Sequence, residues 1–365
     1  MKLMAADLQS LLQYLIDNRG SDLHIRAEGP PYCRIEGELK PFGEPMTAEQ
    51  TLAVLNQILT PRAKKVFDER GECDFSFQAG EIARFRVNAF KRMGKLSLAI
   101  RFIPMKIPSL EELNLPVATM RKIADNTRGL VLVTGITGSG KSSTLSAMVD
   151  YINSTRSDHI LTVEDPIEFV HKDKKSILSQ REIGEDTSDF VEALKMAMRQ
   201  DPDVIMMGEM RDAESVSAAI TAAQTGHLVF GTLHTIDAVQ TINRIIDLYP
   251  PHQQALMRIQ LAESLQAVVS QRLLPGVKGG RIPAIEIMIV TAHVKKMIED
   301  NSSLGITDAL AKGGFYGMQT FNQSLVKLYK DGLAKEEDVL AAASNPDDVK
   351  LAMRGIEQEV NTPGG

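Results

Sequence analysis

The chain contains no tryptophan and only two cysteines, and these scarcities limit the classes of protein it can represent. Cys33 and Cys73 form no Cys-x-x-Cys pair, so neither a disulfide framework nor a redox pair is indicated. We expect two buried thiols instead. Aromatic residues make up only 5% of the chain, so its core must be built mainly from aliphatic side chains and Met.

Long hydrophobic runs are also missing. The longest, residues 129–136 and 282–290, are far too short to cross a bilayer. Residues 1–18 alternate apolar and polar side chains at helical spacing, which argues against a signal peptide. The net charge of −6 disfavours a dedicated nucleic-acid surface, because such domains are usually basic. We therefore expect neither direct membrane insertion nor a nucleic-acid partner.

Residues 1–103 have the pattern of a separate α+β domain. An opening helix with one apolar face should end near Gly20, and a second helix should begin at Thr47, which has capping-box spacing with Gln50. Short strand-like runs occupy residues 23–26, 32–35, 85–90 and 97–102. Prolines at positions 104 and 108 indicate a linker, which we place at residues 104–116.

Residues 117–365 have a different pattern, which begins clearly at Gly129. Short, continuous apolar runs occupy residues 130–134, 160–163, 204–207, 228–232 and 284–289. Helical patterns separate several of them, for example at residues 188–199 and 212–225. Apolar strands that alternate with helices predict an α/β domain with a mostly parallel sheet. Shorter helices, including one at residues 318–329, should follow from about residue 291, and the tail from Asn361 should be disordered.

A phosphate-binding loop follows the first of these strands. Residues 135–142 match the pattern G-x-x-x-x-G-K-[ST], and a helical segment follows directly. Glycines in such a loop let successive N–H groups point at phosphate oxygens. Lys141 would place its charge on the β- and γ-phosphates of ATP, and Ser142 would offer a hydroxyl to Mg²⁺. The predicted nucleotide-binding residues are Gly135, Thr137, Gly138, Ser139, Gly140, Lys141, Ser142 and Ser143.

Carboxylates end two of the later strands. Glu164 ends the second strand in an acidic cluster with Asp165 and Glu168, and could activate the attacking water. Glu209 follows the third strand in an atypical Walker B motif, and is expected to hold Mg²⁺ through its water shell or to share in activating water. Residue types alone leave open which carboxylate is the base. Asp212 is expected to cap the next helix.

Two histidines flank the fourth strand. His227 precedes it and His234 ends it, at the sheet edge that carries the phosphate-binding loop. An imidazole can donate a hydrogen bond to a γ-phosphate, so both are candidate catalytic residues.

These four elements, in this order, resemble the secretion ATPase superfamily. Within it, the chain is similar to the type IV pilus retraction ATPases in four segments: Ser21-Asp22-Leu23-His24, Arg84-Phe85-Arg86-Val87-Asn88, Gly208-Glu209-Met210-Arg211-Asp212 and Gly317-Met318-Gln319-Thr320-Phe321. The resemblance implies a PAS-like N-terminal domain joined flexibly to a RecA-like ATPase domain, assembled as a homohexamer. It implies work at the cytoplasmic face of the inner membrane with a pilus platform protein, and with a related accessory ATPase.

The resemblance also gives roles to arginines of the first domain, which in this family close over nucleotide held by the second. Arg84 and Arg86 alternate along one strand and therefore share a face. Arg101, on another strand-like run, is a third candidate.

Two differences from the sequence motifs of this superfamily help to decide which of its branches the chain resembles. Assembly-type relatives carry a four-cysteine zinc site, which Cys33 and Cys73 alone cannot form, and this favours retraction. The retraction motif Ala-Ile-Arg-Asn-Leu-Ile-Arg-Glu is matched only loosely by Ala292-His293-Val294-Lys295-Lys296-Met297-Ile298-Glu299. An accessory retraction ATPase and an assembly or type II secretion ATPase therefore remain alternatives. A P-loop ATPase that translocates nucleic acid is a further alternative, which the acidic charge disfavours.

Overall fold

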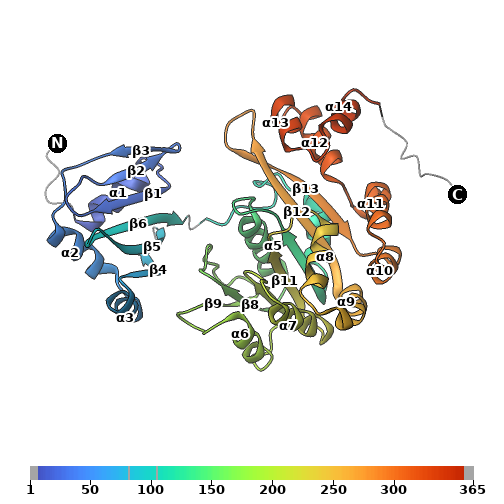
Figure 1. Ribbon diagram of the computed structural model, residues 1–365, viewed down its shortest axis with the longest axis horizontal. Coiled ribbons are helices and arrows are strands. Elements are labelled where there is room, and N and C mark those ends of the chain that lie inside the picture. Colours follow the sequence, from blue (N-terminus) through green and yellow to red (C-terminus); the bar gives the residue numbers. More distant parts are fainter. Residues whose placement is uncertain (1–6, 81–82, 104–105, 357–365) are drawn as a thin grey trace. The chain divides into compact units, whose positions relative to one another are not determined.

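The computed structural model describes residues 7–80, 83–103 and 106–356 (Figure 1). The chain divides into two compact units, Met1–Lys106 and Ile107–Gly365. The division lies inside the segment that prolines indicate as a linker. The predicted disordered tail lies outside the described residues.

The N-terminal unit is an antiparallel sheet with three helices. Its strands have the order β3-β2-β1-β6-β5-β4. They are β1 (Asp22–Arg26), β2 (Tyr32–Ile35), β3 (Glu38–Pro41), β4 (Glu72–Ala79), β5 (Ala83–Arg92) and β6 (Lys95–Ile103), and the helices are α1 (Leu8–Asp17), α2 (Ala48–Ile58) and α3 (Pro61–Arg70). The α+β class is confirmed, whereas β3, β4 and α3 were not indicated by the sequence pattern.

Local sequence determines how these helices begin. The capping box of Thr47 and Gln50 is present at the start of α2, as predicted. The apolar face of α1 is buried in the core of this unit through Leu11, Leu12 and Leu15.

Both cysteines are free and buried in the same core, and burial raises the pKa of the Cys73 thiol to about 11.

The C-terminal unit is built on a sheet with the strand order β13-β12-β7-β11-β10-β8-β9. Only β13 runs antiparallel to its neighbour, so the predicted mostly parallel sheet is confirmed. The strands are β7 (Gly129–Thr134), β8 (His159–Glu164), β9 (Ile177–Glu182), β10 (Val204–Met207), β11 (Leu228–Leu233), β12 (Leu265–Pro275) and β13 (Arg281–Ile289). Every residue of β7, β10 and β11 is buried, which explains why these strands were visible as unbroken apolar runs.

Helices cover both faces of this sheet (Figure 1). One face carries α4 (Val117–Ala124) and α5 (Lys141–Thr155). The other carries α6 (Phe190–Ala197), α7 (Ala213–Gln224), α8 (Ala238–Asp247), α9 (Pro251–Ser264), α10 (Ala292–Glu299) and α11 (Ser303–Lys312). The short helix η1 (Gly313–Tyr316) precedes α12 (Phe321–Lys330), α13 (Glu336–Ala342) and α14 (Pro346–Met353), which pack on the β12–β13 hairpin.

Two details differ from the sequence prediction. The helix expected at residues 318–329 begins at Phe321, because Gln319 pairs with Ile287 of β13 and Thr320 caps the helix. The strands β9 and β12 were not predicted, since polar residues interrupt their apolar patterns. Among the described residues, no helix is both long and apolar enough to span a bilayer.

Candidate nucleotide-binding and catalytic site

The phosphate-binding loop lies between β7 and α5. Gly135 has a φ of +142°, and a Cβ there would lie 2.5 Å from both Ser139 Oγ and the Gln271 carbonyl oxygen. Only glycine fits this position, which the loop needs in order to turn away from the strand. Lys141 Nζ donates to the main-chain oxygens of Gly135 at 2.7 Å and Ile136 at 3.1 Å. Burial lowers the pKa of Lys141, and the neighbouring Glu209 and Glu168 oppose that shift.

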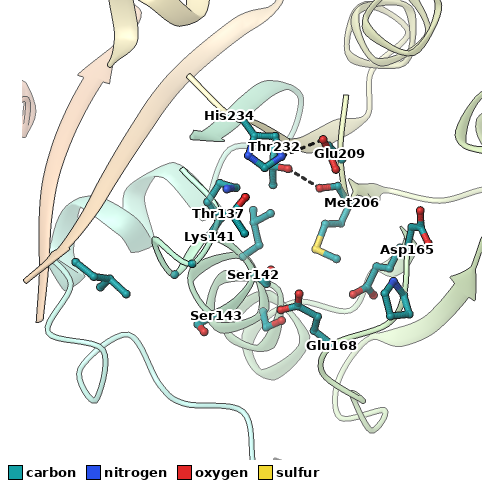
Figure 2. Close-up of a pocket in the computed structure, with 18 of the residues that line it drawn as sticks. Thr137, Lys141, Ser142, Ser143, Asp165, Glu168, Met206, Glu209, Thr232 and His234 are labelled. Carbon is teal, nitrogen blue, oxygen red and sulfur yellow. Dashed lines mark hydrogen bonds and ion pairs between the residues drawn. The ribbon is translucent and has the colours of Figure 1, made fainter. Parts of the chain in front are cut away.

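A pocket of about 380 Å³ opens beside this loop (Figure 2). Its walls are the loop, the start of α5 and the carboxyl ends of neighbouring parallel strands, where ligands bind in open α/β sheets. Nine predicted residues line it: Thr137, Gly138, Gly140, Lys141, Ser142, Ser143, Glu164, Glu209 and His234. Gly135 and Ser139 do not line it, but they shape the loop from behind.

Glu209 is held between two basic side chains. Its Oε2 accepts from Arg211 at 2.7 Å. Its Oε1 lies 3.0 Å from His234 Nε2 (Figure 2). The hydrogen bond from Arg211, together with the charges of Arg211 and His234, lowers the pKa of Glu209. This carboxylate therefore remains ionised and is a weak base.

Glu164 has the opposite environment. It is only 7% exposed, and burial raises its pKa to about 7. The Thr162 hydroxyl donates to Glu164 Oε1 at 2.7 Å, and Gln180 Nε2 donates to the same oxygen at 3.2 Å. A carboxyl group with a pKa near neutrality, on the wall of a nucleotide pocket, has the properties of a general base.

The pocket has further lining residues that the motifs did not identify. Thr232 donates to the Gly208 carbonyl oxygen and so ties the end of β11 to the Glu209 turn. Leu273 and Arg281 reach the pocket from the β12–β13 hairpin. No local motif marks the hairpin residues, because only the pairing of β12 with β7 brings them to the loop.

The two histidines are separated by the length of β11. His227 precedes that strand, and its Nδ1 lies 2.9 Å from the Ala222 carbonyl oxygen at the end of α7. Only His234 lines the pocket. The structure thus does not bring His227 to the nucleotide site. Asp212 caps α7 in a capping box with Ser215, as predicted.

The candidate arginines lie on the N-terminal sheet. Arg86 of β5 and Arg101 of β6 are register partners, and both line a polar cavity of about 310 Å³ with Asp22, Asp74, Asn88 and Ala99. Arg101 Nε donates to Asp22 at 2.8 Å, and Arg86 Nε lies 4.0 Å from Asp74. The side chain of Arg101 is 67% exposed and that of Arg86 is 42% exposed. Arg84 shares the strand face of Arg86 and is the register partner of Ile103.

The oxygen donors of the pocket suit a magnesium ion. Ser142 and Glu209 both line it, and Mg²⁺ is usually held by one or two such protein groups together with phosphate oxygens and water. Among the described residues, no cluster of His, Cys, Asp and Glu could hold a metal alone.

The sheet, the loop and the paired carboxylates define a P-loop ATPase. The chain belongs to the Type II/IV secretion system protein family, whose profile matches residues 2–279. It is 45% identical over 342 residues to the type IV pilus retraction ATPase PilT of Pseudomonas aeruginosa, covering 93% of this chain and 99% of the relative. It is 38% identical to the type IV pilus ATPase PilU of the same organism, covering 97% and 94%. A crystal structure of the pilus retraction motor PilT with bound ADP superposes with a TM-score of 0.89 at 42% identity, covering 94% of this chain and 99% of that one.

Proposed function

We propose that this chain is a motor ATPase that powers type IV pilus retraction by hydrolysing ATP. One observation carries the proposal. The phosphate-binding loop, Glu164 and the Glu209–His234 pair line one pocket, in a chain that is 45% identical to a pilus retraction ATPase over 99% of that protein's length. The lower identity of 38% to PilU favours the retraction motor over the accessory ATPase.

The opposite environments of the two carboxylates suggest separate roles. Glu164, whose pKa is raised to about 7, would take the proton of the attacking water, because a base works best with a pKa near the working pH. Glu209, whose pKa is lowered, would stay ionised beside Ser142 and hold the Mg²⁺ shell. When bound with ATP, Mg²⁺ would neutralise charge on the β- and γ-phosphates. Lys141 would exchange its loop carbonyls for phosphate oxygens, and His234 would orient Glu209 or sense the γ-phosphate.

The motor would work as a homohexamer. In this scheme residues 117–365 form the ATPase domain, residues 104–116 the linker and residues 1–103 the domain that supplies arginines. Arg86 and Arg101 are favoured because both are exposed neighbours on one sheet face. An arginine brought to the γ-phosphate raises turnover by about 10³–10⁵ in other P-loop enzymes. Closing and opening of this contact would convert hydrolysis into motion between the domains.

The partners would be a platform protein of the inner membrane and a related accessory ATPase. The motor would act at the cytoplasmic face of that membrane. Piliation of cells that lack the gene tests this proposal against the alternatives. Loss of a retraction motor leaves excess pili that do not retract, whereas loss of an assembly motor leaves no pili and would contradict the proposal.

A further inference from the structure

Gln180 lies on β9, directly beside the acidic strand end. It is the register partner of Thr162 in the parallel pair of β8 and β9. Both side chains donate to the same atom, Glu164 Oε1. Gln180 does not itself line the nucleotide pocket, so an effect on the reaction would have to pass through Glu164 or through the loop that follows it.

The amide of Gln180 can adopt only one orientation. Its Nε2 donates to Glu164 Oε1 at 3.2 Å and to the Phe169 carbonyl oxygen at 2.9 Å, while its Oε1 accepts from the His171 N–H at 2.7 Å. Rotating the amide by half a turn would place its oxygen against two acceptors and its nitrogen against a donor. The three hydrogen bonds therefore fix the side chain and connect Glu164 to the loop that follows it.

These hydrogen bonds make the two carboxylate oxygens of Glu164 unequal. Thr162 and Gln180 both donate to Oε1 and use the two lone pairs of that oxygen. The Glu168 backbone N–H also bonds to this carboxylate, and Oε2 still has a lone pair that can accept a proton. The same amide holds the loop that carries Glu168 to the pocket wall. One side chain thus fixes both the rotation of the carboxylate and the segment beside it.

We propose that Gln180 is a positioning residue for ATP hydrolysis, which holds Glu164 so that Oε2 faces the nucleotide. This inference rests on the proposed role of Glu164 as the base. Gln180 also stabilises the ionised form of that carboxylate, because a hydrogen bond to the charged form opposes the effect of burial. Glu168, on the following loop, is the charged group that faces Glu164 and acts in the opposite direction, while Thr162 and Gln180 are neutral.

The decisive variant is Gln180→Glu in the full-length protein. It keeps an acceptor for the His171 N–H but replaces the donor to Glu164 with a second carboxylate. We expect kcat near neutral pH to fall by about fivefold, and the acidic limb of kcat against pH to move up by about one unit, because a like charge raises the pKa of the base. KM for ATP should change by less than about threefold, since Gln180 lies outside the pocket.

Ser179→Ala is the matched control. Ser179 is the neighbour of Gln180 on β9, points to the other face, and bonds His159 Nε2 at 2.9 Å. The substitution Ser179→Ala removes one hydrogen bond from the same strand and should leave the pH profile of kcat unchanged. Gln180→Met, which removes both donor and acceptor at similar length, is the second variant and should shift the limb in the same direction.

Three results would overturn the inference: an unshifted profile in Gln180→Glu, a loss of kcat that is equal at every pH, or the same shift in Ser179→Ala. Glu164→Gln separates this failure from failure of the proposed function. If Glu164→Gln retains turnover, Glu164 is not the base. If it is inactive while Gln180→Glu keeps the wild-type profile, only the role of Gln180 is refuted.

Discussion

His234 Nε2 lies 3.0 Å from Glu209 Oε1, so the residue that follows β11 orients a carboxylate in the turn after β10. Removing a partner that orients a metal-associated carboxylate typically costs about 10–100-fold in activity. We expect His234→Ala to lower kcat within that range. His227→Ala is the matched comparison, because His227 lies at the other end of the same strand, and should change kcat by less than about threefold. Equal losses of kcat in the two variants would show that the contact with Glu209 does not cause the loss in His234→Ala.

The raised pKa of Glu164 predicts a pH dependence. A base must be deprotonated to accept a proton, so kcat should rise with pH through the pKa of about 7 and fall as the carboxylate is protonated below it. Steady-state ATPase assays across the neutral range measure this limb. Glu164→Gln should bind ATP yet lose about 10²–10⁴ in turnover. Should Glu209→Gln alone behave in this way while Glu164→Gln stays active, the two carboxylates exchange roles.

Lys141 should be essential for both binding and hydrolysis. Lys141→Ala removes the P-loop charge on the phosphates, so turnover should vanish and the affinity for ATP should fall. Lys122→Ala, an exposed lysine of α4 in the same unit, is the control and should behave like wild type. Ordinary turnover by purified Lys141→Ala would refute the assignment of the site.

The arginine proposal concerns assembly rather than the pocket itself. Arg86→Ala and Arg101→Ala should bind ATP normally but hydrolyse it poorly. An exposed charge that meets only water contributes about 0–1 kcal/mol, which corresponds to less than tenfold in rate, so a larger deficit indicates a catalytic contact. Arg92→Ala is the control, because Arg92 is an exposed arginine at the far end of β5, the strand of Arg86. The fragment of residues 129–365 should also bind ATP and hydrolyse it slowly; turnover equal to that of the intact chain would exclude a catalytic role for the first domain.

The parts of this site that could be predicted each lie at or just after the end of an apolar strand. These are the phosphate-binding loop, Glu164, Glu209 and His234. Parallel strands present their carboxyl ends at one edge, so the proximity of these parts follows from the pattern. The class of each domain was predictable because apolar strands alternate with helices after Gly129, whereas residues 1–103 combine short strand-like runs with two helical segments. The same rule favours His234, which follows its strand, over His227, which precedes it, and of the two only His234 lines the pocket.

Residues placed by long-range pairing could not be predicted. Arg281 and Leu273 reach the pocket only because β12 pairs with β7, and Gln271 and Arg272 obscure the apolar pattern of β12. Gln180 belongs to β9, a half-exposed edge strand without a continuous apolar run. Its contact with Glu164 depends on the register of β8 with β9, which no local motif specifies.

We propose above that hydrolysis at this pocket powers pilus retraction. The most direct test is the retraction frequency of fluorescently labelled pili in cells where Glu164→Gln replaces the wild-type protein. This variant should bind ATP without hydrolysing it, so the account predicts pili that extend normally and do not retract. Retraction at the wild-type frequency, or cells without pili, would contradict it.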